Sequence, residues 1–396
     1  MTFEHDDSNE SGVSIKVIGV GGGGNNAVNR MITDKIVGVD FVAVNTDRQA
    51  LNKSEAGTKL VIGSKITHGF GCGANPEMGE RAAEESLEDI KKMLSGTDMA
   101  FVIAGMGGGT GTGAAPVIAR VAHEMDILTI GIVTKPFEFE LQKRMRQAEA
   151  GIAELSQYVD SLVVIPNERL KEVTDTCITM FKAFETADSV LRNGVKSISD
   201  LINGFGFINL DFADVTSVMK NAGYAHMGVG SGTGADKAEV AAKEAISSPL
   251  LETSIKGAHG ILMSMTISPD VSLEDATLAS KMIASEASED ATVIWGVSFD
   301  TDLEDEMKIT IIATGFEKKP EQQPVPAEKK AAPAPAPEVK TIPAVKPTAT
   351  VVEPKVEAKP AEQPAPEPVK EEKKTVVNDD DFDDLFDDFF KPKNRK

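Results

Sequence analysis

The segment MAFVIAGMGGGTGTG, residues 99–113, passes from an apolar run into a glycine-rich loop. The run 99–105 predicts a buried strand, and the residues after Gly113 continue in a helical pattern. Such a loop directs backbone N–H groups and a helix dipole at one point, where phosphate can bind. Five glycines from Gly107 to Gly113 are more than a tight turn needs, so a purely structural turn is disfavoured. The loop lacks the Lys of a Walker A loop, which argues against a P-loop NTPase.

A second glycine segment lies near the amino terminus of the chain. Gly19, Gly21 and Gly24 fit G-x-G-x-x-G after a strand at 14–19, with a helix expected from about Asn25. Alone, this pattern suggests a dinucleotide-binding fold, and Asp47 stands where that fold needs an acid. The dinucleotide interpretation leaves the loop at 105–113 unexplained. An NAD-binding oxidoreductase therefore remains an alternative at this point.

The first half of the chain alternates short apolar runs with helical segments, which predicts an α/β fold. Such alternation implies a parallel sheet covered on both faces, with ligands at the carboxyl ends of its strands. Further strands are expected at 41–45, 128–133 and 162–165. A long helix at 178–202, with apolar residues every three or four positions, should run between two domains. Beyond it we expect a smaller α/β domain with its own sheet, containing a helix at 237–246 and strands at 261–266, 293–299 and 309–313.

The composition of the chain changes after residue 316. Six of the twenty prolines precede this point and fourteen follow it. Residues 317–377 are therefore predicted to be a disordered Pro/Ala/Glu/Lys linker, because they cannot bury enough apolar surface to offset ordering entropy. The end, 378–396, carries apolar residues at three- and four-residue spacing, typical of a short helix that docks in a partner's groove; the alternative is a solubilising acidic tail. These apolar residues are Phe382, Leu385, Phe386, Phe389 and Phe390.

Bulk properties exclude several classes of protein. A formal charge of −21 argues against a general nucleic-acid binder. The two cysteines, Cys72 and Cys177, and the scattered histidines predict neither a disulfide framework nor a zinc site. The acidic start of the chain is unlike a secretory signal, and no apolar stretch approaches the roughly 20 residues of a membrane span. We expect a soluble cytoplasmic protein.

Several segments together resemble the tubulin/FtsZ family, from about residue 13 to 316. They are GVGGGGNNAVNRM, AVNTD, GANPEMG, GMGGGTGTGAAPV, VTKPFEFE, IPNERL, AFETADSVLRNGV and NLDFADV. The resemblance implies a tubulin-like fold with GTP as ligand, and it divides the chain into six parts. These are a flexible segment 1–12, a Rossmann-type GTP-binding domain 13–176, a central helix 177–203, a C-terminal domain 204–316, the linker 317–377 and the peptide 378–396. Two departures are Leu141, where the family has Gly, and the end of the chain, which lacks the family's Ile-Pro.

The resemblance also implies the residues that hold GTP. The expected phosphate-binding residues are Gly21, Gly22, Gly23, Gly24, Asn25, Asn26, Gly107, Gly108, Gly109, Thr110, Gly111, Thr112 and Gly113, with Ala74 and Asn75 near the γ-phosphate. Glu140 and Arg144 match a pair that contacts the ribose, and Asn167 belongs to the same site. Phe184 should stack on the base, and Asp188, one turn later, should accept the N–H donors of guanine. The alternative for these last two is a core aromatic and a solvated charge.

For hydrolysis, the resemblance assigns Asn209, Asp211 and Asp214 to the GTP site of the neighbouring subunit in a head-to-tail filament. Mg²⁺ would be bound mainly through the phosphates, with no protein ligand expected. The alternative for Asp211 and Asp214 is a helix cap. The implied function is a GTPase of bacterial cell division, which forms a ring at mid-cell and meets membrane-tethering partners through 378–396. A nucleotide-binding scaffold that does not polymerise is a further alternative.

Overall fold

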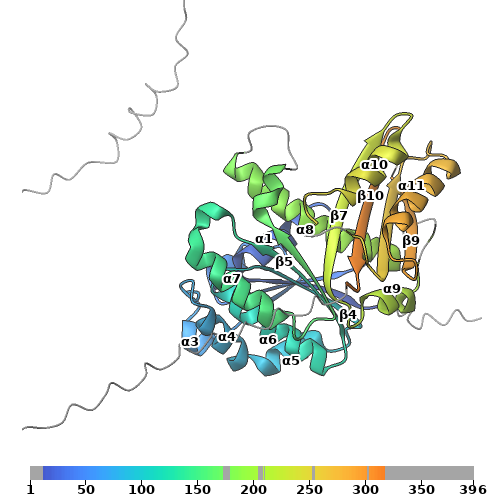
Figure 1. Ribbon diagram of the computed structural model, residues 1–396. Helices are drawn as coiled ribbons and strands as arrows, with labels where there is room; N and C mark the ends of the chain where they lie inside the picture. Colours follow the sequence, from blue (N-terminus) through green and yellow to red (C-terminus); the bar gives the residue numbers. More distant parts are fainter. Residues whose placement is uncertain are drawn as a thin grey trace, which may run out of the picture. The chain divides into compact units, whose positions relative to one another are not determined.

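A ten-stranded, mostly parallel sheet organises the structure, a computed structural model (Figure 1). The structure describes residues 12–172, 179–203, 208, 210–251, 255–300 and 303–316. Cys177, Asn209, the linker and the terminal peptide lie outside the described residues. The strand order is β3-β2-β1-β4-β5-β6-β7-β10-β8-β9. The strands are β1 (Ile15–Val20), β2 (Asp40–Asn45), β3 (Thr58–Val61), β4 (Met99–Gly105), β5 (Leu128–Lys135), β6 (Ser161–Pro166), β7 (Gly223–Thr233), β8 (Gly260–Ile267), β9 (Thr292–Phe299) and β10 (Glu306–Thr314).

Helices cover both faces of the parallel part of the sheet, as the alternating sequence predicted. Along β1, Ile15 and Val17 belong to a core shared with α1 and α8, whereas Ile18 and Val20 face a core shared with α4 to α7. The α-helices are α1 (Gly21–Thr33), α2 (Arg48–Asn52), α3 (Ser64–Thr67), α4 (Pro76–Glu85), α5 (Leu87–Leu94), α6 (Thr110–Glu124), α7 (Leu141–Leu155), α8 (Met180–Ile202), α9 (Phe212–Met219), α10 (Lys237–Ile246) and α11 (Leu273–Glu286). The described residues also form two 3₁₀-helices, η1 (Glu138–Glu140) and η2 (Asn167–Glu172).

The long helix α8 begins at Met180, where Thr179 accepts a hydrogen bond from the backbone N–H of Lys182. It packs against α1 and β5 on one side and against β8, β9 and β10 on the other. The apolar stripe expected over 178–202 is thus covered by elements from both ends of the chain. Residue 178 itself lies outside the described residues.

The second sheet is not separate, which corrects the expectation of an independent sheet in the C-terminal part. Strand β7 pairs in parallel with β6 over Gly223–Ala225 and then in antiparallel fashion with β10. Its sequence, GYAHMGVGSGT, was not expected to be a strand, because glycine weakens a strand interior. A Cβ at Gly228, Gly230 or Gly232 would lie 2.1–2.2 Å from backbone oxygens of α10. These glycines therefore let α10 pack directly on β7.

Candidate functional site

The two glycine segments meet where two helices begin. Strands β1 and β4 are parallel neighbours with Val20 opposite Ala104, so their carboxyl ends lie side by side. Helix α1 begins at Gly21 rather than near Asn25, and α6 begins at Thr110. A Cβ at Gly21 would lie 2.8 Å from the backbone N of Gly111, so the two helix starts are in contact. Neither start has a side-chain cap, which leaves their N–H groups for an anion.

The glycines of these segments fall into two groups. A Cβ at Gly24 would lie 2.3 Å from the carbonyl O of Ile103, and one at Gly113 would lie 2.0 Å from that of Pro76. These glycines are required by close packing. Gly22 and Gly108 have φ outside the positive range, and a Cβ on either would meet nothing within 4 Å. Their missing side chains leave space on the open side of the loops, and this cradle fits a phosphate chain.

Hydroxyl and amide groups hold the glycine segments in shape. Thr110 Oγ1 lies 2.7 Å from Thr46 Oγ1, and the thiol of Cys72 donates to Thr46 Oγ1 at 3.3 Å. Thr112, which is buried, accepts a hydrogen bond of 2.8 Å from the backbone N–H of Gly107. The buried amide of Asn25, oriented to suit its neighbours, donates to the carbonyl O of Gly19 at 2.7 Å and accepts from Asn45 at 3.1 Å. Thr112 and Asn25 thus have supporting roles inside the loops.

The segment containing Ala74 and Asn75 adjoins the loop of α6. A Cβ at Gly109 would lie 3.0 Å from the backbone N of Asn75, and Ala74 has φ of +59°. Asn75 also caps α4 by accepting from the N–H of Glu77. A hollow of about 320 Å³ beside this contact is lined by Asn75, Thr112, Gln147 and other residues of α4, α6 and α7. The structure therefore brings the three expected phosphate-binding segments together.

Glu140 and Arg144 form an ion pair of 2.9 Å beside the glycine loop. The Glu140 side chain is 12 % exposed and also accepts from the backbone N–H of Phe137. A Cβ at Gly107 would lie 2.7 Å from the carbonyl O of Arg144, which places this backbone next to the loop. Leu141 has φ of 71° and ψ of 160°, a region that glycine occupies readily. Leu141, which stands where the family has Gly, therefore has a strained backbone conformation.

Phe184 and Asp188, the residues expected to bind the base, lie on α8 near Phe137 and Asn167. Phe184 is 43 % exposed, and its ring meets Phe137 edge-on at 5.2 Å, so it is not a core aromatic. Asn167 begins η2, which packs on α8; its Oδ1 is buried and has no hydrogen-bond partner. An unpaired buried acceptor is costly unless a ligand satisfies it. Burial raises the pKa of Asp188 to about 6, against the opposing effect of the Arg30 guanidinium, so Asp188 is not simply a solvated charge.

Asp211 and Asp214 lie away from the glycine segments. Asp211 caps α9, since its Oδ1 accepts from the backbone N–H of Asp214 at 2.8 Å. Helix α9 packs on β8 and β9, and just beyond its end Lys220 pairs with Asp126, which precedes β5. At the other end of α9, Leu210 donates its backbone N–H to the carbonyl O of Leu201 near the end of α8, and Asn203, just past α8, donates to the carbonyl O of Gly38 before β2. Both ends of α9 therefore lie toward the amino ends of the parallel strands, whereas the glycine segments follow their carboxyl ends. The cap expected as an alternative is present for Asp211.

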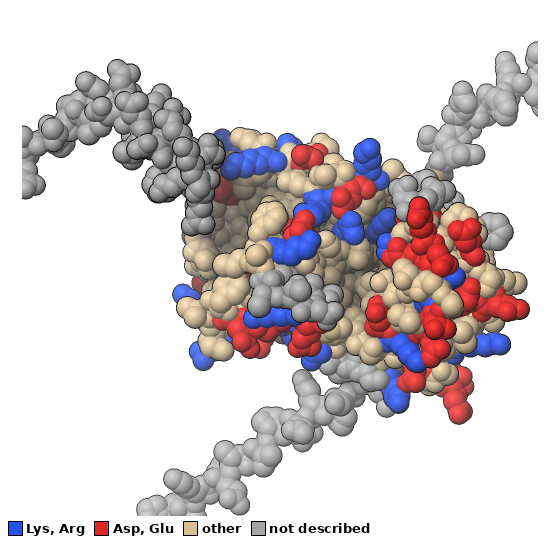
Figure 2. Space-filling model, turned by 90° about the horizontal axis from the view of Figure 1, so that it is seen from above, with Lys and Arg blue, Asp and Glu red and all other residues tan. Residues whose placement is uncertain are grey.

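Acidic side chains gather on one part of the surface. Figure 2 shows acidic side chains gathered over the part of the molecule that carries α10 and α11, with Lys and Arg scattered between them. A hollow of about 1180 Å³ lies at the amino ends of the strands and is lined by Asp160, Tyr224, His259 and neighbouring residues. It is remote from the glycine segments. Sequence reasoning singled out none of Thr46, Phe137 and Arg30, although Thr46 could have been found from its place after an apolar strand.

The chain is similar to known proteins over most of its described residues. Residues 14–175 match the Tubulin/FtsZ family GTPase domain, and residues 223–317 match the FtsZ family C-terminal domain. The structure of an empty FtsZ dimer from M. jannaschii is 42 % identical with a TM-score of 0.75, over 78 % of this chain and 89 % of that one. A GTPγS-bound protofilament of CetZ2 from Haloferax volcanii is 19 % identical with a TM-score of 0.64, over 77 % of this chain and 94 % of that one. At that identity the second likeness concerns the fold alone. No helix in the described ranges is long and apolar enough to cross a membrane.

Proposed function

Because this chain belongs to the tubulin/FtsZ family, whose members are GTPases that form cytoskeletal filaments, we propose that it hydrolyses GTP at the contacts between subunits of a head-to-tail filament. In this proposal the filament forms the division ring at mid-cell in the bacterial cytoplasm. The observation that carries the proposal is the meeting of two uncapped helix starts, at Gly21 and Thr110, on adjacent carboxyl strand ends. Gly22 and Gly108 leave the open side of this meeting point clear for phosphates.

The remaining groups suit the other parts of GTP. Glu140 and Arg144 would meet the ribose. Phe184 offers an exposed ring for stacking, worth roughly 1–3 kcal/mol per base. Asp188 would accept the adjacent N–H donors of guanine, and Asn167 has a buried oxygen that needs a partner. The dinucleotide alternative is weaker, because it gives no role to the second uncapped helix start at Thr110, which lies against the first.

Hydrolysis needs an oriented water and stabilisation of negative charge on the phosphates. Mg²⁺ held by the phosphates would supply part of that charge, and we assign it no protein ligand. Asp211 and Asp214, with Asn209 outside the described residues, would orient the water in the site of the next subunit. Their position at the amino ends of the strands supports this division, because one subunit then carries the two halves of the site on opposite edges of its sheet. The cap uses Oδ1 of Asp211, which leaves Oδ2 for such a role.

The test compares turnover per subunit across a dilution series for the wild type, Asp211→Ala and Asp211→Asn. Turnover per subunit should rise above an assembly threshold in the wild type. Both variants should bind GTP normally but lose about 100-fold or more in turnover, the usual contribution of a group that handles the attacking water. Asn is as good a helix cap as Asp, so Asp211→Asn keeps α9 stable, while Asp211→Ala loses about 1 kcal/mol. Turnover that is flat on dilution, with an active Asp211→Asn protein, would contradict the shared site.

A further inference from the structure

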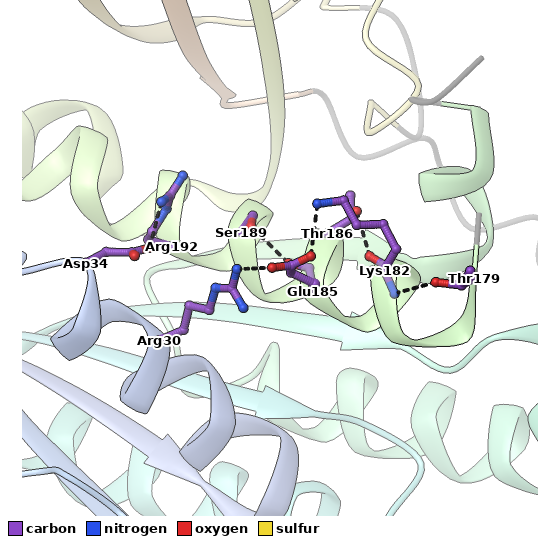
Figure 3. A network of polar contacts seen from close by, with 8 residues as sticks. All are labelled: Arg30, Asp34, Thr179, Lys182, Glu185, Thr186, Ser189 and Arg192. Carbon is purple, nitrogen blue, oxygen red and sulfur yellow. Dashed lines mark hydrogen bonds and ion pairs between the residues drawn. The ribbon is translucent and has the colours of Figure 1, made fainter. Parts of the chain in front are cut away.

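A line of ion pairs joins α1 to α8 next to the proposed base site. Figure 3 shows Arg30 reaching from α1 to Glu185 on α8, and the second oxygen of Glu185 accepts from Lys182 at 2.9 Å. Farther along the same two helices, Arg192 pairs with Asp34 at 2.6 Å. Both cross-helix pairs are partly shielded from water. Arg30 is therefore held at one position over α8.

Asp188 lies beside the Arg30–Glu185 pair. It follows Glu185 by three residues, so the two carboxylates share one side of α8. Arg30 attracts the Asp188 carboxylate and Glu185 repels it. Other charged groups nearby are paired elsewhere: Asp34, just after α1, pairs with Arg192, Glu168 of η2 pairs with Lys171, and Lys182 pairs with Glu185. Arg169 of η2 donates to the backbone carbonyls of Pro249 and Leu251. Arg30 is thus the cation that acts on Asp188.

The charge on Asp188 decides which base it suits. Guanine presents two adjacent N–H donors, and the two oxygens of a carboxylate can accept hydrogen bonds from both. A protonated carboxyl group would place its O–H donor opposite one of these N–H donors and lose that hydrogen bond. Adenine presents a ring acceptor at the same edge, which favours a protonated carboxyl group instead. Burial alone pushes Asp188 toward the protonated form. A fixed cation beside it shifts the balance back toward guanine.

We propose that Arg30 is a positioning residue for base selection: anchored by Glu185, it holds a positive charge beside Asp188, so that this carboxylate meets guanine as an anion. This inference rests on the proposed function, because it requires Asp188 to face the base. It adds a residue from α1 to the selection of the nucleotide. It also gives Glu185 two opposed effects, since it anchors the cation and repels the carboxylate.

The experiment measures the affinities of nucleotide-free protein for GDP and ADP between pH 5 and pH 8.5. Diphosphates avoid hydrolysis, and the ratio of the two affinities cancels the titration of the phosphates. In the wild type the preference for GDP should fall below about pH 6, where Asp188 takes up its proton. In Arg30→Met the midpoint should move up by about one pH unit, which lowers the preference as much as tenfold below that midpoint.

Arg192→Met is the matched control, since it breaks the other pair between α1 and α8. Arg192 lies one turn after Asp188, but its guanidinium is paired with Asp34 and does not act on the Asp188 carboxylate. Arg192→Met should keep the wild-type midpoint, and Arg30→Lys should restore most of the preference. A midpoint in Arg30→Met equal to that of Arg192→Met would overturn the inference. If Arg30→Met does not fold, Arg30→Gln takes its place, because it keeps a hydrogen-bond donor for Glu185 but removes the positive charge. An unmoved midpoint in that variant would overturn the inference equally. A wild type that does not prefer GDP over ADP would instead refute the proposed nucleotide site.

Discussion

Replacing Asp188 with Asn should stabilise the nucleotide-free protein while removing its preference for guanine. The carboxylate of Asp188 is largely buried on α8, and this burial raises its pKa from 3.8 to about 6. The folded protein therefore binds a proton at Asp188 more tightly than the unfolded chain does. At neutral pH, where the group is ionised in both states, folding must bury a charge. Asn keeps the shape of the side chain and removes that cost.

The size of the gain follows from the pKa difference. A rise from 3.8 to about 6 corresponds to about 3 kcal/mol at pH 7. Partial access of water to Asp188 reduces this to about 1–2 kcal/mol in the free energy of unfolding. The penalty of the wild type is absent below pH 3.8 and grows until the pH exceeds about 6. The advantage of Asp188→Asn should therefore shrink on acidification, to about a third of its neutral value near pH 4.5.

Urea unfolding of nucleotide-free wild type and Asp188→Asn at pH 7.5 and pH 4.5 measures this difference. Asp34→Asn is the control, because its wild-type side chain is paired with Arg192 and the substitution should give no gain. In parallel, Asp188→Asn should lose its preference for GTP and gain affinity for xanthosine triphosphate, whose base carries a carbonyl in place of the 2-amino group. An Asp188→Asn protein that is no more stable at pH 7.5, or whose advantage is independent of pH, would refute the reasoning.

Three further expectations follow from the backbone and the tail. Gly22→Ala and Gly108→Ala should fold normally but bind GTP at least about tenfold more weakly, because each methyl group enters the phosphate cradle. Gly109→Ala would put a Cβ 2.7 Å from that of Cys72, so it should instead lower the free energy of unfolding by about 1–3 kcal/mol, measured by thermal melting. Leu141→Gly should raise the free energy of unfolding by about 1 kcal/mol by relieving backbone strain, and an unchanged melting temperature would contradict this. A chain that ends at residue 316 should still assemble with GTP in light scattering but lose its docking partners, and loss of nucleotide binding would count against a separable tail.

Local patterns in the sequence determined much of the fold. The strand at 99–105 and the helix at 237–246 were predicted at their observed bounds, because an apolar run before glycines and an amphipathic period depend on neighbouring residues. The glycine segments also identified the candidate phosphate loops without any contact information. A loop that contains more glycines than a turn needs can be recognised from the sequence alone. The start of α1 was missed by four residues, because its glycines join the helix to pack against β1 and β4.

Only the tertiary structure decided which glycines face a ligand and which face the protein. Gly22 and Gly24 belong to one run of consecutive glycines, yet Gly22 borders open space and Gly24 lies against the carbonyl O of Ile103. The strand β7 could not be predicted from its glycine-rich sequence. Its glycines are needed because α10, which follows β7 in the chain, packs against them. Arg30 and Glu185 are 155 residues apart, so no local period could place this cation beside Asp188. Local periodicity specifies the elements, whereas packing between distant segments specifies which atoms of those elements meet.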